Sequence, residues 1–341
     1  MKQPQYSTGI DIASDDFVVS ISTKPGIALH GPQKFDNNPE GFKKLEAWFK
    51  QNKLKPKDMM ICMEATGVYG ESLCYFLHSQ KYTLAVEPPI KVKRAFKIDG
   101  HKTDPVDSLQ IAKYGIRFYD ELEVWEPREE IVEKMKSLIT TRELLVGHKA
   151  AAMKSLTALN RKAVRPSAAI RILESYIKTT AAKIVNLGKE MDKLILNQPK
   201  MRQTVENLKT MPGVRNLLSY SMLVVTNGFK SDKHYKQINS YLRIAPLMYE
   251  SGSSVFRRPR TPKHGPPVMR KLLYLAALSS VTHKPVFRKY YLRKQKEGKE
   301  KRLILNNVEN KLVKIMCALI RDQKPYIENY QSVHPNLLKM A

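Results

Sequence analysis

The chain is poor in the residues that build thiol and imidazole sites. It has three cysteines, Cys62, Cys74 and Cys317, and eight histidines among 341 residues. The cysteines lack the spacing of a zinc site, and their neighbours are apolar. We therefore expect reduced, packed thiols in a cytoplasmic protein, because disulfides are rare in that compartment.

Long apolar runs and glycine-rich loops are also missing. The longest apolar stretches, near 217–225 and 272–281, fall far short of the ~20 residues of a membrane span. The N-terminus lacks the apolar region of a signal peptide, so we expect no membrane partner. With only 15 glycines, the chain shows no further phosphate loops, which disfavours an actin-like sugar kinase despite the opening "GIDIAS".

Acidic residues are scarce in one part of the chain only. Residues 1–128 carry 18 Lys and Arg against 17 Asp and Glu, a net charge of +1. Residues 129–341 carry 41 against 15, a net charge of +26. This distribution predicts a near-neutral chemical module followed by a region that binds a polyanion, nucleic acid above all.

Hydrophobic patterning predicts an α/β module at 1–128. Strands are expected at 6–13, 16–23, near 27–35, at 59–63 and at 82–86. A helix follows Asn37 or Asn38, and further helices are expected at 69–79 and 104–118, the last starting with Asp104 and Pro105. Alternation of this kind indicates a mixed sheet with helices on both faces.

The remainder is predicted to be mainly helical. Residues 129–162 form one long helix, and after a break at 165–167 a heptad pattern follows in steps of 3, 4, 7, 3, 4 and 3 from Ile170 to Leu194. We expect an antiparallel coiled-coil hairpin at 129–200 that mediates dimerisation, with an ordinary helical core as the alternative. A mainly α domain is expected at 201–330, where Gly213 in "MPGV" marks a turn of helix-hairpin-helix type or a plain interhelical turn.

Four acids occupy positions that one sheet can bring together. Asp11 lies in the first apolar strand, and Glu64 directly follows the strand at 59–63. Asp104 and Asp107 open a helix three residues apart. Oxygen ligands of this type suit Mg²⁺ or Mn²⁺, which activate phosphodiester cleavage. Taken singly, these acids are also compatible with helix caps or surface ion pairs.

A second stretch with chemical potential is "APLMYESGSSVFRRPRTPKHG", residues 245–265. Hydroxyl groups stand beside cations there, a pattern that favours serine attack on a phosphate or simply a basic loop. Tyr249 is a competing nucleophile. The basic run 287–302 includes Tyr290 and Tyr291, whose rings are suited to stacking on bases or belong to a solvated helix face.

The motifs "GIDIAS", "MEATGVYG", "KTDPVDSLQIA", "MPGV" and "SGS…PKHG…MRKLLYLAAL" resemble the insertion sequence 110 family of transposases, over nearly the whole chain. Pro266 and Pro267 depart from the polar pair that is more usual there. The resemblance implies a RuvC-like, ribonuclease H-type fold for residues 1–128, with divalent metal on Asp11, Glu64, Asp104 and Asp107. It also implies that Ser251, or Ser253 in another register, becomes joined to DNA.

The resemblance further implies donor and target DNA as partners, a structured guide RNA, and a homodimer or tetramer. The expected nucleic-acid contacts are Lys102, Arg257, Arg258, Arg260, Lys263 and Arg270. Two other functions remain open at this point. One is a metal-dependent nuclease that resolves Holliday junctions, which needs no serine. The other is a non-catalytic nucleic-acid-binding protein.

Overall fold

The computed structural model describes residues 4–23, 27–65, 67–96, 104–230, 233–251, 255–261 and 265–328. Of residues 104–105, 247–251 and 255–260 it describes the backbone alone. The chain divides into two compact units, Met1–Pro127 and Arg128–Ala341. The further division at residue 200 stays a prediction. In the described parts, no helix has the length and apolarity to cross a membrane.

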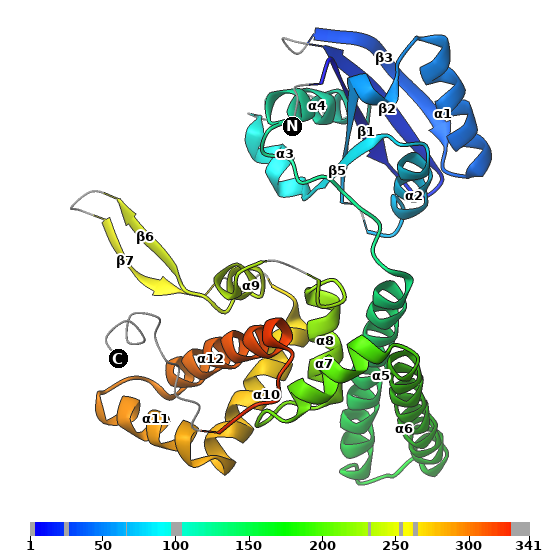
Figure 1. Cartoon of the computed structure of the whole chain (residues 1–341). Helices are drawn as coiled ribbons and strands as arrows, with labels where there is room; N and C mark the ends of the chain where they lie inside the picture. Colours follow the sequence, from blue (N-terminus) through cyan, green and yellow to red (C-terminus); the bar gives the residue numbers. More distant parts are fainter. Residues whose placement is uncertain are drawn as a thin grey trace, which may run out of the picture. The chain divides into compact units, whose positions relative to one another are not determined.

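The first unit is built on a five-stranded mixed sheet (Figure 1). Its strands are β1 (Tyr6–Ile12), β2 (Asp16–Thr23), β3 (Ile27–Asp36), β4 (Met59–Glu64) and β5 (Thr83–Glu87), in the spatial order β3-β2-β1-β4-β5. β1 pairs with β2, and β2 with β3, in antiparallel sense, whereas β4 is parallel to β1 and β5 is parallel to β4. This order and sense are those of the ribonuclease H-like sheet, which confirms the expected fold class.

Helices cover both faces of this sheet. The elements are α1 (Pro39–Gln51), the 3₁₀ turn η1 (Pro56–Asp58), α2 (Glu71–Ser79), α3 (Pro89–Ala95) and α4 (Asp104–Arg117). α1 begins as expected, because the Asn38 side chain accepts a hydrogen bond of 2.8 Å from the backbone N–H of Gly41. Phe49 and Leu77 pack with Ile10 on one face, while Ile111 and Tyr114 of α4 pack with Cys62 on the other.

The second unit is mainly helical and begins with a long helix pair. α5 (Glu130–Asn160) and α6 (Ser167–Leu196) run side by side in opposite directions (Figure 1). The remaining helices are α7 (Pro199–Lys209), α8 (Asn216–Val225), α9 (Tyr235–Tyr241), α10 (Pro267–His283), α11 (Pro285–Lys296) and α12 (Lys301–Asp322), and a hairpin of β6 (Leu247–Ser251) and β7 (Val255–Arg260) follows α9. The apolar faces of α8, α9, α10 and α12 form one core.

The turn at "MPGV" has a packing role that the sequence did not reveal. Gly213 has φ +74°, and a Cβ there would lie 2.4 Å from the backbone oxygen of Ala276 in α10. Glycine has no Cβ, so it allows the two backbones to come this close and adopts the left-handed conformation without strain. Gly213 therefore brings the α7–α8 turn against α10, and a phosphate-binding role for it stays a prediction.

Candidate active site

Asp11 and Glu64 lie at matching positions at the carboxyl ends of neighbouring parallel strands. The register of β1 and β4 pairs Ile10 with Met63, so the next positions along are Asp11 and Glu64. Paired residues of adjacent strands are about 5 Å apart and point to the same face. The sheet alone thus brings together the two acids that the sequence placed in separate strands.

Helix α4 covers the face to which these acids belong. A Cβ on Gly9 would lie 2.1 Å from the backbone oxygen of Ser108, and one on Gly115 would lie 2.4 Å from Oγ of Ser7. Ser7, Gly9 and Asp11 are two residues apart and therefore share one face of β1. That face lies against α4. The hydroxyls of Ser20 and Ser108, 2.8 Å apart, hold the N-terminal part of the helix to β2.

Asp107 belongs to the helix face that meets the sheet. It stands one turn before Ile111, which packs with Cys62 and Ala85 of β4 and β5. Asp107 itself is half-buried, and the side chain of Asp104 lies outside the described residues. Asp11, Glu64 and Asp107 therefore come from three elements that meet at one region of the sheet.

A further acid, Glu87, belongs to the same row. It ends β5, pairs with Glu64 in the parallel register, and is 3% exposed. Nζ of Lys91, in the first turn of α3, lies 2.8 Å from its Oε2. This residue was missed in the sequence, although "TLAVE" ends an apolar strand with an acid just as "MICME" does.

The donor set fits a hard cation in its chemistry, because carboxylate oxygens are what Mg²⁺ and Mn²⁺ prefer. The neighbouring thiol does not add to it: burial, and then the charges of Glu87 and Glu64, raise the pKa of Cys62 to about 12. Among the described side chains, no three acids, histidines or cysteines stand close enough together to hold a metal. Asp104 falls outside that statement.

Two parts of the serine stretch form the antiparallel strands β6 and β7 (Figure 1). Ser251 is the last residue of β6, and its backbone pairs with Val255. Ser253, Lys102 and Lys263 lie outside the described residues, as do the side chains of Arg257, Arg258 and Arg260. The structure thus locates the backbone of Ser251 at the end of strand β6, and its role stays a prediction.

Arg270 is the expected nucleic-acid contact whose side chain is described. It lies in the first turn of α10, which starts with Pro266 as N-cap and Pro267 at its first position. The two prolines therefore begin the helix. Opposite Arg270, α12 carries Glu309, 6% exposed, and burial raises the pKa of its carboxyl to about 7 while Arg270 and Arg302 lower it.

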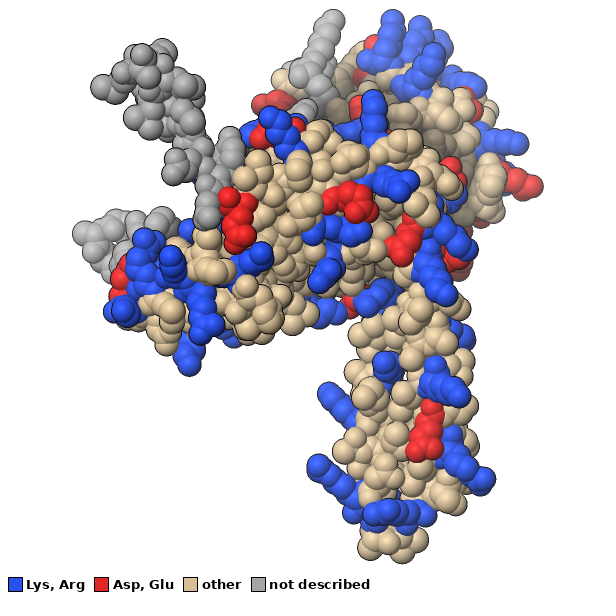
Figure 2. All heavy atoms as spheres, turned by 60° about the horizontal axis from the view of Figure 1, so that its bottom comes forward, with Lys and Arg blue, Asp and Glu red and all other residues tan. Residues whose placement is uncertain are grey.

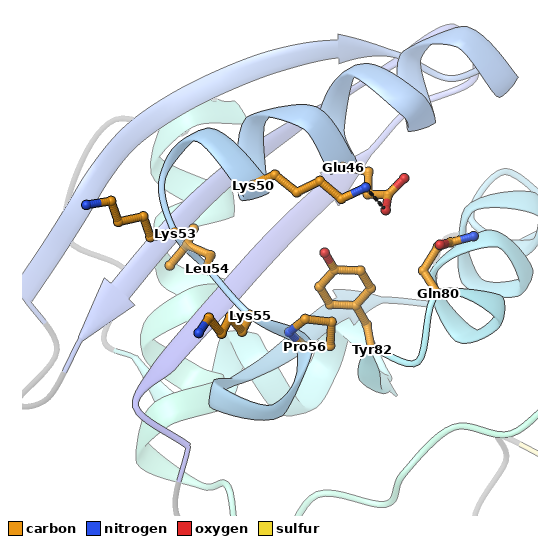
Figure 3. A pocket seen from close by; sticks show the side chains of 8 residues that line it. All are labelled: Glu46, Lys50, Lys53, Leu54, Lys55, Pro56, Gln80 and Tyr82. Atoms are coloured by element: carbon orange, nitrogen blue, oxygen red, sulfur yellow. Dashed lines mark ion pairs between the residues drawn. The ribbon is translucent and has the colours of Figure 1, made fainter.

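A pocket of about 330 Å³ in the first unit lies away from the acids (Figure 3). Tyr82 and Leu54 in its wall belong to the core that contains Ile10, on the sheet face opposite Asp11. Lys50 forms an ion pair of 2.7 Å with Glu46, so an acid of the pocket wall already neutralises this lysine. In Figure 3 the side chains of Lys53 and Lys55 extend away from the ring of Tyr82. We assign this pocket no role in the site.

Both compact units contain segments that match models of one class of protein, the transposases. Residues 8–162 match a model described as a transposase, and residues 205–292 match one described as a transposase of the IS116/IS110/IS902 family. The chain belongs to the IS110 family of transposases.

Relatives of known name agree in length with this chain. The pilin gene-inverting proteins of Moraxella lacunata and Moraxella bovis are 28% identical over 331 and 330 residues, covering 93% of this chain and 96% of each relative. An uncharacterised insertion element IS110 protein of Streptomyces coelicolor is 26% identical over 115 residues, 34% of this chain and 28% of that protein. Thermus thermophilus RuvC matches 35% of this chain and 99% of its own at 11% identity and a TM-score of 0.28.

Proposed function

We propose that this protein is a recombinase that moves an insertion sequence by cutting and rejoining DNA strands. The observation that carries the proposal is the position of Asp11 and Glu64, each directly after the last register pair of β1 and β4, Ile10 with Met63, in a chain of this family. With Asp104 and Asp107 these acids would hold Mg²⁺ or Mn²⁺, and a bound ion would supply positive charge to the scissile phosphate.

The second part of the chemistry is assigned to Ser251. Its hydroxyl oxygen attacks the phosphorus, and the bond from phosphorus to the neighbouring sugar oxygen breaks. The serine proton leaves, and the departing sugar oxygen takes up a proton. The phosphodiester energy is kept in the serine–DNA ester, so a sugar hydroxyl from another strand can reverse the step and rejoin DNA. The names of the Moraxella relatives, which invert a gene, are consistent with rejoining.

The nucleic-acid partners are proposed from the charge of the helical unit, and the guide RNA from the resemblance to the family. Donor and target DNA bind the basic surface of this unit, and a structured RNA pairs with both to select sequence. Sequencing the nucleic acid that copurifies with the protein tests the proposal of a guide RNA. We expect one discrete RNA species, and random cellular RNA would contradict the proposal.

Self-association is assigned to the α5–α6 pair, which leaves Leu144, Ile172 and Val185 between 57% and 69% exposed. We propose that these side chains pack against a second copy in a homodimer or tetramer. Sedimentation equilibrium gives the number of copies, and a monomer at all concentrations would contradict the assignment.

Trapping the covalent intermediate tests the catalytic proposal. The protein is incubated with labelled donor DNA and Mg²⁺, denatured, and analysed for DNA joined to the chain. We expect the adduct in the unsubstituted protein and in Ser253→Ala, and its loss in Ser251→Ala, in Asp11→Asn and after chelation of the metal. Normal recombination by Ser251→Ala would contradict a serine nucleophile there, and cleavage without rejoining would favour the metal-dependent nuclease instead.

A further inference from the structure

The helical unit contains a groove that none of the expected site residues line. It has a volume of about 380 Å³ and lies between α9 and α12, which pack side by side. The segment after α9 is held to α12 because Asn306 and Asn310 both donate hydrogen bonds to the backbone oxygen of Ile244, at 2.9 and 3.1 Å. The groove is lined by Tyr235, Lys236, Asn239, Ala245, Asn310, Lys311 and Lys314.

The lining is strongly positive. It contains three lysines and no carboxylate, and within the described part of the chain none of the three lysines forms an ion pair. Burial, and then the charges of Arg293, Lys294 and Lys314, lower the pKa of Lys311. Positive charge is thus concentrated here with no ion-pairing acid among the described residues, an arrangement that attracts an anion.

Aromatic rings hold two of these ammonium groups in place. Nζ of Lys311 is 3.7 Å from the centroid of the Tyr290 ring, and Nζ of Lys314 is 5.5 Å from that of Tyr235. A cation on a ring face uses no hydrogen-bond acceptor, so its N–H groups stay available to a ligand. Tyr290 packs on the core and contacts Lys311 through its ring, and base stacking by this residue stays a prediction.

Asn239 contributes a polar side chain to the wall of the groove. The side chain is 4% exposed and lines the groove, yet its Oδ1 has no hydrogen-bond donor among the described residues. Oδ1 is an acceptor, so it requires a donor such as water and does not bind a phosphate oxygen. The lysines, and not Asn239, are therefore the groups of the groove that can bind an anion.

We propose that the groove between α9 and α12 binds the phosphodiester backbone of a nucleic acid, with Lys311 and Lys314 as the phosphate contacts. This rests on the proposed function, which makes nucleic acid the substrate. DNA and RNA share the phosphate chemistry, and the experiment below separates them.

The test is the salt dependence of binding for Lys311→Met/Lys314→Met. Affinity for a labelled mixed-sequence DNA duplex and for a single-stranded RNA of the same length is measured by fluorescence anisotropy across a salt series. Each lost phosphate contact makes the slope of log K against log salt shallower by about 0.9 on duplex DNA and about 0.7 on a single strand. We therefore expect a change of about 1.8 on the duplex or about 1.4 on the RNA, and the affected probe identifies the ligand.

The control is Lys193→Met/Lys209→Met, which changes the net charge equally. These lysines are already paired with Glu190 and Glu206 at 2.7 and 3.0 Å, so we expect a slope close to that of the unsubstituted protein. Thermal unfolding verifies that both variants fold. Equal slopes for the groove variant and the control would overturn the proposal that the groove binds phosphate. Failure of the unsubstituted protein to bind either probe would instead overturn the proposed function.

Discussion

At the scale of single residues, Glu87 and Lys91 decide the charge beside the candidate site. Glu87 is buried next to Glu64 in register, and a carboxylate in that position is stable only with a partner. Lys91 supplies it from the first turn of α3, with half of its side chain in solvent. Because the pair offsets the charge of Glu87, Asp11 and Glu64 have one less uncompensated acid beside them.

Lys91→Met leaves the Glu87 carboxylate without that partner. We expect a loss of about 1–3 kcal/mol in the free energy of unfolding at neutral pH, measured by urea denaturation. The hydrogen bond to Glu87 raises the pKa of Lys91 above 10.5, so the contribution is fully present below pH 10.5 and is lost as the pH rises through the raised pKa. Lys93→Met, on the same helix, is the control, and an equal loss in both variants would contradict the role of the pair.

At the scale of elements, the contact of α4 with β1 positions the helix that carries Asp104 and Asp107. The backbones approach so closely at Gly9 that a Cβ there would lie 2.1 and 2.2 Å from atoms of Ser108 and Ala112. The strands, the α1 cap and the start of α4 were predictable from local patterns. This contact was not, because it depends on which strand the helix crosses.

Gly9→Ala is expected to displace α4 from the sheet. Both near atoms belong to the helix backbone and cannot rotate away, so we expect a loss of about 3 kcal/mol in the free energy of unfolding. The matched control is Gly31→Ala in β3, where a Cβ meets nothing within 4 Å and the change stays within about 0.5 kcal/mol. Urea denaturation of both variants measures the difference, and similar stabilities would show that α4 tolerates the added methyl group.

At the scale of the whole molecule, chemistry and charge are divided between the two units. The acids of the sheet belong to the near-neutral first 128 residues, and the net charge of +26 belongs to the rest. Each unit has its own hydrophobic core. Figure 2 shows Lys and Arg side chains along the projecting α5–α6 pair with few acidic ones between them.

Limited trypsin digestion exploits this division. Arg128 is exposed and precedes α5 in a segment without helix or strand from 125 to 129, so we expect early cleavage there. After separation, the fragment that starts at residue 129 should retain most of the affinity for a DNA duplex, and the fragment 1–128 little of it. Filter binding of the two fragments at one salt concentration measures this, and comparable affinities would contradict the division.

The sequence by itself determined the elements, the charge division and the candidate acids, because caps, apolar periodicity and net charge are local properties. It also carried the motifs of the transposase family. Only the tertiary structure showed that Glu87 joins the row of Asp11 and Glu64, that Gly9 seats α4, and that α9 and α12 enclose a basic groove. These features arise from strand register and helix packing between residues far apart in the chain, which local patterns do not specify.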